Sequence, residues 1–330
     1  MARRLFQYDP LISYKFIPSL KARIEHEDGG YLLKTNQLGF RSDHEFHKQK
    51  DPSLKRILLF GDSFTAGDGV SNGKRYSDFL EQMLPNTEIY NFGLPGTSTD
   101  QHYLIWKKYA PDIEYDLVVI GLQIHNINRI VARYRRYLNR QGETILLSKP
   151  YFTLDNEDEI RLQNMPVSNK KIPIYDLDPF QLKYVETIGS LPRLKKLIKK
   201  LGPKTVDNFQ KILRFQPLKA YNKKTNPSWL LMKAILNQWA IESKKSILIC
   251  PIPLYQYIEG ISSPKNYQER FESLQNSPHT LIHDPLKDLM SYSQSERREF
   301  RFKVDQHFTS KGHMALAKSL LTSIKPILYS

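Results

Sequence analysis

The chain has 330 residues, of which 40% are hydrophobic and 12% aromatic. This composition is typical of a globular protein with one substantial core and excludes a disordered or fibrous chain. Its 49 lysines and arginines against 34 acidic residues give a formal net charge of +15, which favours anionic surfaces or substrates in general without choosing among them.

Two features of the sequence bear on disulfide bonds and on the cellular location of the protein. The single cysteine, Cys250, rules out an intramolecular disulfide framework, and its apolar surroundings at 247–250 are typical of a small buried residue. The first ten residues are basic but carry no apolar segment, and no run of 18 apolar residues occurs in the sequence. We therefore expect no export signal, no membrane span and a cytoplasmic location.

The first 50 residues are irregular in pattern, with a turn at 26–30, and we expect them to form an arm that wraps around the core. Five short apolar runs then predict buried parallel strands, at 56–61, 88–92, 117–122, 246–252 and 280–283. Apolar residues at helical spacing predict helices at 76–84, 99–109 and 310–327. Strands that alternate with helices indicate βαβ units and a parallel sheet covered on both faces.

The alternation stops between residues 130 and 245, where eight prolines separate short segments. We expect this stretch to be a mostly helical insertion or lid, and the core to consist of 51–129 and 246–330. Within the insertion, residues 191–201 place apolar side chains on one helical face and cations on the other. This pattern suits a helix at a membrane surface, but a solvated helix packed on the core has the same pattern and is more common.

A serine follows the first predicted strand of the sheet, in the sequence GDSFTAG at 61–67. Ligands of open α/β sheets bind at the carboxyl ends of the strands, so Ser63 stands where chemistry is expected. The same residue also suits a helix N-cap or a turn.

The far end of the chain supplies the partners that a serine nucleophile needs. A serine hydroxyl needs a base to take its proton, and the base needs a carboxylate to hold its tautomer. Asp305 and His307, in the sequence DQHFTSKGH at 305–313, can provide both. They could instead cap the last helix, but Thr309 or Ser310 is already a competent cap.

Two further blocks follow the second and third strands of the predicted sheet, NFGLPG at 91–96 and His125-Asn126. The backbone N–H groups of Ser63 and Gly96 and the side-chain amide of Asn126 could donate hydrogen bonds to a developing oxyanion.

These four blocks, in this order and each after its own strand, resemble those of the SGNH (GDSL) hydrolase family. The resemblance implies a flavodoxin-like three-layer α/β/α sandwich with a central parallel sheet. It also implies Ser63 as nucleophile, Asp305 and His307 as its partners, and Gly96 and Asn126 as oxyanion donors. The segment from Tyr8 to Arg41 is similar to the lead-in of members from bacterial cell-surface polysaccharide pathways.

The sequence departs from the family pattern without losing a catalytic atom. Phe64 replaces the usual leucine of GDSL, and the third block reads His125-Asn126-Ile127 where Gly-Asn-Asp is commoner. One residue separates Asp305 from His307, and Thr309 stands where many members have proline or asparagine. His125 could alter what fits beside the oxyanion site, or it could be a packed, hydrogen-bonded histidine.

We therefore predict a serine esterase or O-acyltransferase that forms an acyl-Ser63 intermediate, with an O-acetyl ester of a carbohydrate or another natural product as the favoured substrate. One alternative is a noncatalytic relative that binds a glycan or a partner, and another is a lipase-like esterase at a membrane surface. Hydrolysis and transfer cannot be separated, because they share the intermediate. Nucleic-acid binding is not expected, since the cations lack a recognisable framework.

Four residues near the blocks are candidate substrate contacts: Asp62, His125, Arg129 and Arg133. The arginines at 129, 133, 136 and 140 would share one face if this segment were helical, and could then hold a phosphate or carboxylate of the substrate. A solvated basic face, or ion pairs with the acids at 157–159, would give the same pattern. No cofactor is expected, and the nine histidines show no metal-binding spacing.

Overall fold

The computed structural model describes residues 5–138, 143–186, 215–277 and 279–329. Its centre is a five-stranded sheet in the order β14-β13-β7-β5-β6, in which every strand is parallel to its neighbours. The strands are β5 (Lys55–Gly61), β6 (Thr87–Asn91), β7 (Leu117–Gln123), β13 (Ile247–Ile252) and β14 (Thr280–Ile282). The five predicted strands are thus confirmed to within about one residue at each end.

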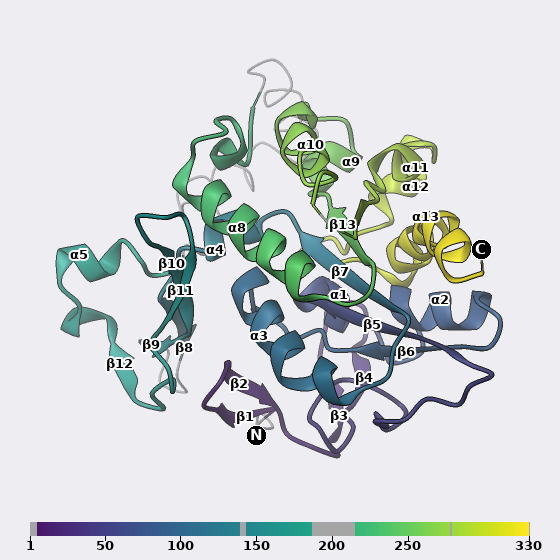
Figure 1. The fold of residues 1–330 in the computed structure, drawn as a ribbon, viewed down its shortest axis with the longest axis horizontal. Coiled ribbons are helices and arrows are strands. Elements are labelled where there is room, and N and C mark those ends of the chain that lie inside the picture. The colour runs from purple at the N-terminus through teal and green to yellow at the C-terminus, as the bar shows by residue number, and fades with distance from the viewer. Residues whose placement is uncertain (1–4, 139–142, 187–214, 278, 330) are drawn as a thin grey trace.

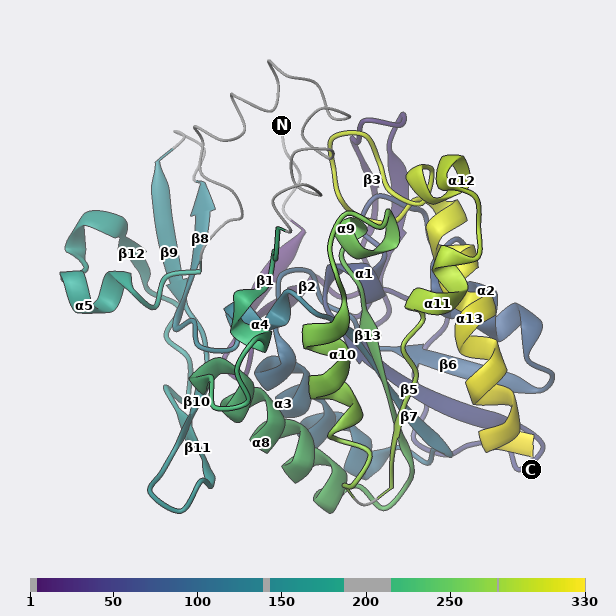
Figure 2. The same cartoon turned by 90° about the horizontal axis from the view of Figure 1, so that it is seen from above.

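Helices cover both faces of the sheet, which explains why β7 and β13 are buried at every position. Helices α3 (Thr99–Tyr109) and α8 (Pro227–Glu242) pack together on one side, and α2 (Tyr76–Met83) packs with α13 (Ser310–Tyr329) on the other (Figures 1 and 2). The predicted helices at 76–84, 99–109 and 310–327 are all present, so the α/β/α sandwich is confirmed.

An aromatic cluster joins the sheet to the layer formed by α3 and α8. The ring of Trp239 lies 5.4 Å from that of Phe60 on β5, 5.8 Å from that of Tyr103 and 5.7 Å from that of Trp106. Trp239 and Phe60 are fully buried. Contacts of this kind bury large apolar areas and contribute much of the stability of a core.

The N-terminal arm is more regular than its sequence indicates. It forms two antiparallel hairpins, β1 (Phe6–Asp9) with β2 (Ser13–Phe16) and β3 (Lys21–Ile24) with β4 (Tyr31–Lys34). Each strand has only four residues, which is too short for an alternating pattern to stand out.

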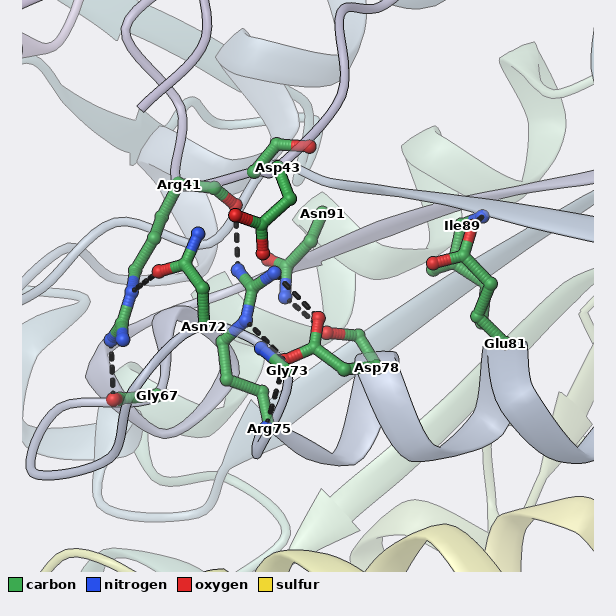
Figure 3. A network of polar contacts seen from close by, with 12 residues as sticks. Arg41, Asp43, Gly67, Asn72, Gly73, Arg75, Asp78, Glu81, Ile89 and Asn91 are labelled. Carbon is green, nitrogen blue, oxygen red and sulfur yellow. Dashed lines mark hydrogen bonds and ion pairs between the residues drawn. The ribbon is translucent and has the colours of Figure 1, made fainter. Parts of the chain in front are cut away.

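A buried guanidinium connects this arm to the loop that follows Ser63. Arg41 donates from its Nη1 to the carbonyl oxygens of Ala66 at 3.1 Å and Gly67 at 2.5 Å, and from its Nε to Asn72 at 2.7 Å. Its own carbonyl accepts from Arg75 Nη1 at 2.6 Å (Figure 3). Because a guanidinium has five N–H donors in a fixed plane, one side chain can hold several carbonyls of an irregular loop.

The stretch at 130–186 differs from the mostly helical insertion that the sequence predicts. Its described residues are mainly strands, which form a three-stranded sheet in the order β12-β9-β8 and a hairpin of β10 with β11. Their bounds are β8 (Tyr134–Leu138), β9 (Thr144–Ser148), β10 (Tyr151–Leu154), β11 (Ile160–Gln163) and β12 (Lys171–Pro173). Helix α8, also placed in the insertion by the sequence, belongs instead to the sandwich. The amphipathic stretch at 191–201 lies outside the described residues.

Short helices complete the structure: α1 (Ser63–Ala66), η1 (Ala110–Asp112), α4 (Asn126–Arg129), η2 (Ile174–Asp176), α5 (Pro179–Leu182), η3 (Lys219–Tyr221), α9 (Tyr255–Ile258), α10 (Lys265–Glu272), α11 (Leu286–Met290) and α12 (Gln294–Arg298). In the part of the chain that the structure describes, no helix combines the length and the apolar character needed to cross a membrane.

The aromatic cluster gives a test of the fold on helix α8 itself. We expect Trp239→Ala to lower the free energy of unfolding by about 3–5 kcal/mol, because it leaves a cavity among aromatic rings. Ile241→Ala, at a residue 65% exposed on the same helix, should change it by less than about 0.5 kcal/mol. Denaturant titration of both variants measures the difference. Equal effects would contradict the position of α8 on the sheet.

Candidate active site

The first element of the site is the sharp turn from β5 into α1. Asp62 caps α1 by accepting the N–H of Phe64 on its Oδ1 at 3.0 Å. Gly61 is required by a close approach, since a Cβ there would lie 2.0 Å from Thr65 Oγ1 and 2.6 Å from the carbonyl oxygen of Gly121 on β7. Ser63 is therefore presented at the carboxyl end of β5, an inner strand of the sheet, as the sequence predicts, and 6% of its surface is exposed.

The loop before α13 brings the other two predicted residues to this serine. Ser63 Oγ lies 2.7 Å from His307 Nε2, and His307 Nδ1 lies 2.6 Å from Asp305 Oδ1. A carboxylate can only accept, so Nδ1 of His307 carries a proton, and in the neutral ring Nε2 accepts from the serine hydroxyl. The structure thus brings together residues that are 244 positions apart in one hydrogen-bonded line.

Charges around His307 favour its protonated form. Burial lowers the pKa of His307, but the hydrogen bond to Asp305 and the negative charge of Asp68 outweigh burial, and the net effect raises this pKa above its usual value. Burial likewise opposes ionisation of Asp305, yet its hydrogen bonds with His307 and its charge interaction with that ring hold the pKa of this carboxyl well below its usual range. Asp305 is therefore ionised and can stabilise an imidazolium on His307.

Gly96 lies in a loop held by two other parts of the chain. The carbonyl of Pro95 accepts from the Tyr14 hydroxyl at 2.6 Å and from Arg135 Nη1 at 2.8 Å. The φ of Gly96 is +70°, and the Arg135 guanidinium occupies the place that a Cβ would take. The positive φ favours glycine at this position.

Asn126 is fully buried beside Asp62, the residue that precedes Ser63. Its Nδ2 donates to Asp62 Oδ2 at 3.3 Å, whereas its Oδ1 has no hydrogen-bond partner. One of its two amide hydrogens is thus used by Asp62. The predicted oxyanion roles of Gly96 and Asn126 remain predictions.

A pocket of about 210 Å³ opens beside Ser63 and His307. Three of the predicted substrate contacts, Asp62, His125 and Arg129, line it. Its other walls are largely apolar and come from Phe64, Leu254, Tyr255, Ile258, Phe300 and Phe308. A larger hollow of about 720 Å³, between α3, α8 and the β10–β11 hairpin, does not include the serine.

His125 and Arg129 face this pocket in different charge states. Burial, together with the charge of Arg129, lowers the pKa of His125 to about 4, so its ring is neutral near pH 7. The cation of Arg129 is already paired, with Asp62 Oδ2 at 3.3 Å and with Glu186 Oε1 at 2.9 Å.

The predicted helical row of arginines is wrong. Residues 134–138 form strand β8, so side chains alternate between two faces and the four-residue spacing has no meaning there. Arg133 does not line the pocket, and its guanidinium instead lies 3.9 Å from the ring of Tyr184 and 4.7 Å from that of Tyr151. Arg140 lies outside the described residues.

Sequence reasoning missed several residues of the pocket. Arg297 and Arg301 line it, although neither belongs to a motif. Arg301 pairs with Glu259 at 2.7 Å and lies 4.4 Å from the ring of Tyr255. Asp68, whose charge acts on His307, directly follows the serine block at 61–67. Its nearness to Ser63 in the sequence is the only signal that could have identified it. In the described part of the chain, no group of three or more His, Cys, Asp or Glu side chains could hold a metal ion.

Comparisons with known proteins show a remote likeness. No family model and no curated protein matches the chain. Similar solved structures include a lipolytic G-D-S-L family protein from Veillonella parvula (12% identity, TM-score 0.38, covering 82% of this chain and 99% of that chain). A lipase/acylhydrolase from Enterococcus faecalis has 15% identity and a TM-score of 0.39, covering 83% of this chain and 97% of that chain. An acetylxylan esterase, Axe2, from Geobacillus stearothermophilus has 16% identity and a TM-score of 0.42, covering 84% of this chain and 96% of that chain.

The identities and TM-scores are low, so the function has to be inferred from the geometry of the site.

The charges around His307 give a test that needs no substrate. Asp68 raises the pKa of His307, so Asp68→Asn should lower this pKa and move the titration of the ring to lower pH. Asp43→Asn, which removes an exposed acid paired with Lys34, should leave it in place. NMR titration of the His307 ring signals measures both. An unchanged midpoint in Asp68→Asn would show that Asp68 does not act on His307.

Proposed function

We propose that this protein is a serine esterase of the SGNH type, which cleaves or transfers an O-acyl group through an acyl-Ser63 intermediate. The observation that carries the proposal is the continuous line from Ser63 Oγ through His307 to Asp305, with distances of 2.7 and 2.6 Å. A noncatalytic binding role would leave this alignment, at the edge of a pocket, without a purpose.

We assign a step to each of these residues. Ser63 Oγ attacks the ester carbonyl while His307 Nε2 takes its proton, and the ionised Asp305 stabilises the resulting imidazolium. His307 then gives the proton to the departing alcohol oxygen as the C–O bond breaks, which leaves the acyl group on Ser63. Water, or an acceptor alcohol, then attacks the acyl carbonyl as His307 Nε2 takes its proton, the bond from the acyl carbon to Ser63 Oγ breaks, and His307 returns the proton to Ser63. Hydrolysis and transfer therefore differ only in the second nucleophile.

The oxyanion of both tetrahedral intermediates needs donors that are already in place. We assign this role to the N–H groups of Ser63 and Gly96 and to Asn126 Nδ2. The loop of Gly96 is anchored through Pro95 to Tyr14 and Arg135, and Asn126 is fixed beside Asp62. Such anchoring is what a preorganised oxyanion site requires, because donors that had to reorient would lose much of their effect.

The size of the pocket favours a small acyl group. Its volume of about 210 Å³ is below the roughly 300–1,000 Å³ of sites for drug-sized ligands, and apolar side chains form much of its wall. We infer that a short acyl group such as acetyl enters this pocket while the alcohol part faces solvent. A carbohydrate as the alcohol rests on the resemblance of the N-terminal segment to polysaccharide-pathway members.

The nucleophile gives the first test of this proposal. Ser63→Ala should abolish hydrolysis of p-nitrophenyl acetate, and His307→Ala should lower kcat by about 10³ or more, because triad members act as a unit. Ser53→Ala, at an exposed serine, should hydrolyse p-nitrophenyl acetate at the rate of the wild-type protein. Intact-mass measurement after incubation with a fluorophosphonate should find one adduct, located at Ser63. Undiminished turnover in Ser63→Ala would refute the assignment.

The size of the pocket gives the second test. With p-nitrophenol as the constant leaving group, kcat/KM should be at least about tenfold higher for acetate than for octanoate. Leu254→Ala, which widens the pocket, should improve the octanoate-to-acetate ratio by about tenfold. Leu230→Ala, on an exposed part of α8, should not. If Leu254→Ala left the ratio unchanged, the acyl group would have to bind elsewhere.

A further inference from the structure

The loop that carries Asp305 is held from outside by the turn between β3 and β4 of the N-terminal arm. Glu27 accepts the backbone N–H of Asp305 at 2.7 Å and that of Val304 at 3.0 Å. Val304 itself is 86% exposed, so little packing holds this part of the loop. The arm thus supplies polar contacts where the core supplies few.

The preceding residue of the same turn reaches the carboxylate itself. His26 Nε2 lies 3.0 Å from Asp305 Oδ2, while Asp305 Oδ1 binds His307 Nδ1. Each carboxylate oxygen is therefore engaged by a different histidine. Since the carboxylate can only accept, His26 Nε2 carries a proton and donates it to this hydrogen bond.

The ring of His26 is itself fixed. Its side chain is 12% exposed and lies 4.4 Å from the ring of Phe302 and 6.0 Å from that of Tyr31, measured between centroids. The turn that presents it depends on Gly30, whose φ is +86° and where a Cβ would meet the Ile24 carbonyl oxygen at 2.5 Å. A ring held in this way offers its N–H in a defined direction.

We propose that His26 is a positioning residue that holds the Asp305 carboxylate in the plane needed to orient His307. This inference rests on the proposed function. The carboxylate is 34% exposed, so without His26 water would compete for Oδ2 and the side chain could rotate about its last bond. A carboxylate free to rotate would hold His307 less well, and the cost would appear in kcat, because the ester itself does not touch His26.

The central test compares two substitutions of the same residue. His26→Leu removes the donor while keeping an apolar side chain against Phe302, and should lower kcat for p-nitrophenyl acetate by roughly 10- to 100-fold with KM nearly unchanged. His26→Gln, whose Nε2 can donate from a similar position, should recover kcat to within about threefold of the unchanged protein. His44→Leu is the matched control, since it removes another histidine–carboxylate contact of the arm, with Glu81 at 3.4 Å, and should leave kcat unchanged.

A double-mutant cycle separates positioning from a general loss of structure. If His26 acts through Asp305, His26→Leu should cause little further loss of kcat in an Asp305→Ala background. Losses that multiply in the two backgrounds would overturn the proposal, and so would an unchanged kcat in His26→Leu. Should His26→Leu fail to fold by circular dichroism, His26→Met against His26→Gln makes the same comparison with side chains of equal length.

The outcomes also distinguish this inference from the proposed function. Ser63-dependent turnover with an indifferent His26 rejects the positioning role alone. Turnover that survives Ser63→Ala rejects the esterase assignment itself.

Discussion

The site depends on one hydrogen bond between residues far apart in the chain, from the Ser63 hydroxyl to His307 Nε2. The distance between Ser63 Oγ and His307 Nε2 depends on the position of α13, because the loop that carries His307 leads directly into that helix. His313, buried near the start of α13, accepts the N–H of Tyr76 on its Nδ1 at 3.3 Å, and burial lowers the pKa of His313 to about 3 so that it stays neutral. Gly312 lets the helix approach, since a Cβ there would meet the Phe300 carbonyl oxygen at 2.3 Å.

Segments outside the sandwich also hold the site. The N-terminal arm contributes Arg41 to the loop that follows Ser63, and the segment at 130–186 contributes Arg135 to the Gly96 loop. Both guanidiniums bind backbone carbonyls of loops that belong to the core. Neither segment is therefore a passive addition, because each fixes a loop whose shape the parallel sheet alone would not determine.

The sequence predicts the sandwich and the line from Ser63 to Asp305 because both follow local rules. Buried parallel strands are continuous apolar runs, the serine block directly follows β5, and the histidine block directly precedes α13. The prediction of helices at 130–186 was wrong because the strands there are short and only partly buried. The prolines and arginines of this segment therefore dominated its sequence pattern. The contact of His26 with Asp305 joins positions 279 apart in the chain, and no spacing rule relates them.

The arginines explain why the net charge of +15 is a poor guide to the substrate. Around the pocket, Arg129 is paired with Asp62 and Glu186, and Arg301 with Glu259. At the other end of the sheet, Arg56 is buried, binds Glu88, and donates to the carbonyls of Gln49 and Glu114. These three cations neutralise local acids, and Arg56 also closes loops, so they are not free to bind an anionic substrate. The acids near His307 raise the pKa of its ring, so the field at the reacting atoms is not that of a basic surface. Under the proposed function, we therefore expect the shape of the pocket and the direction of a few donors, rather than the overall charge of the protein, to select the substrate.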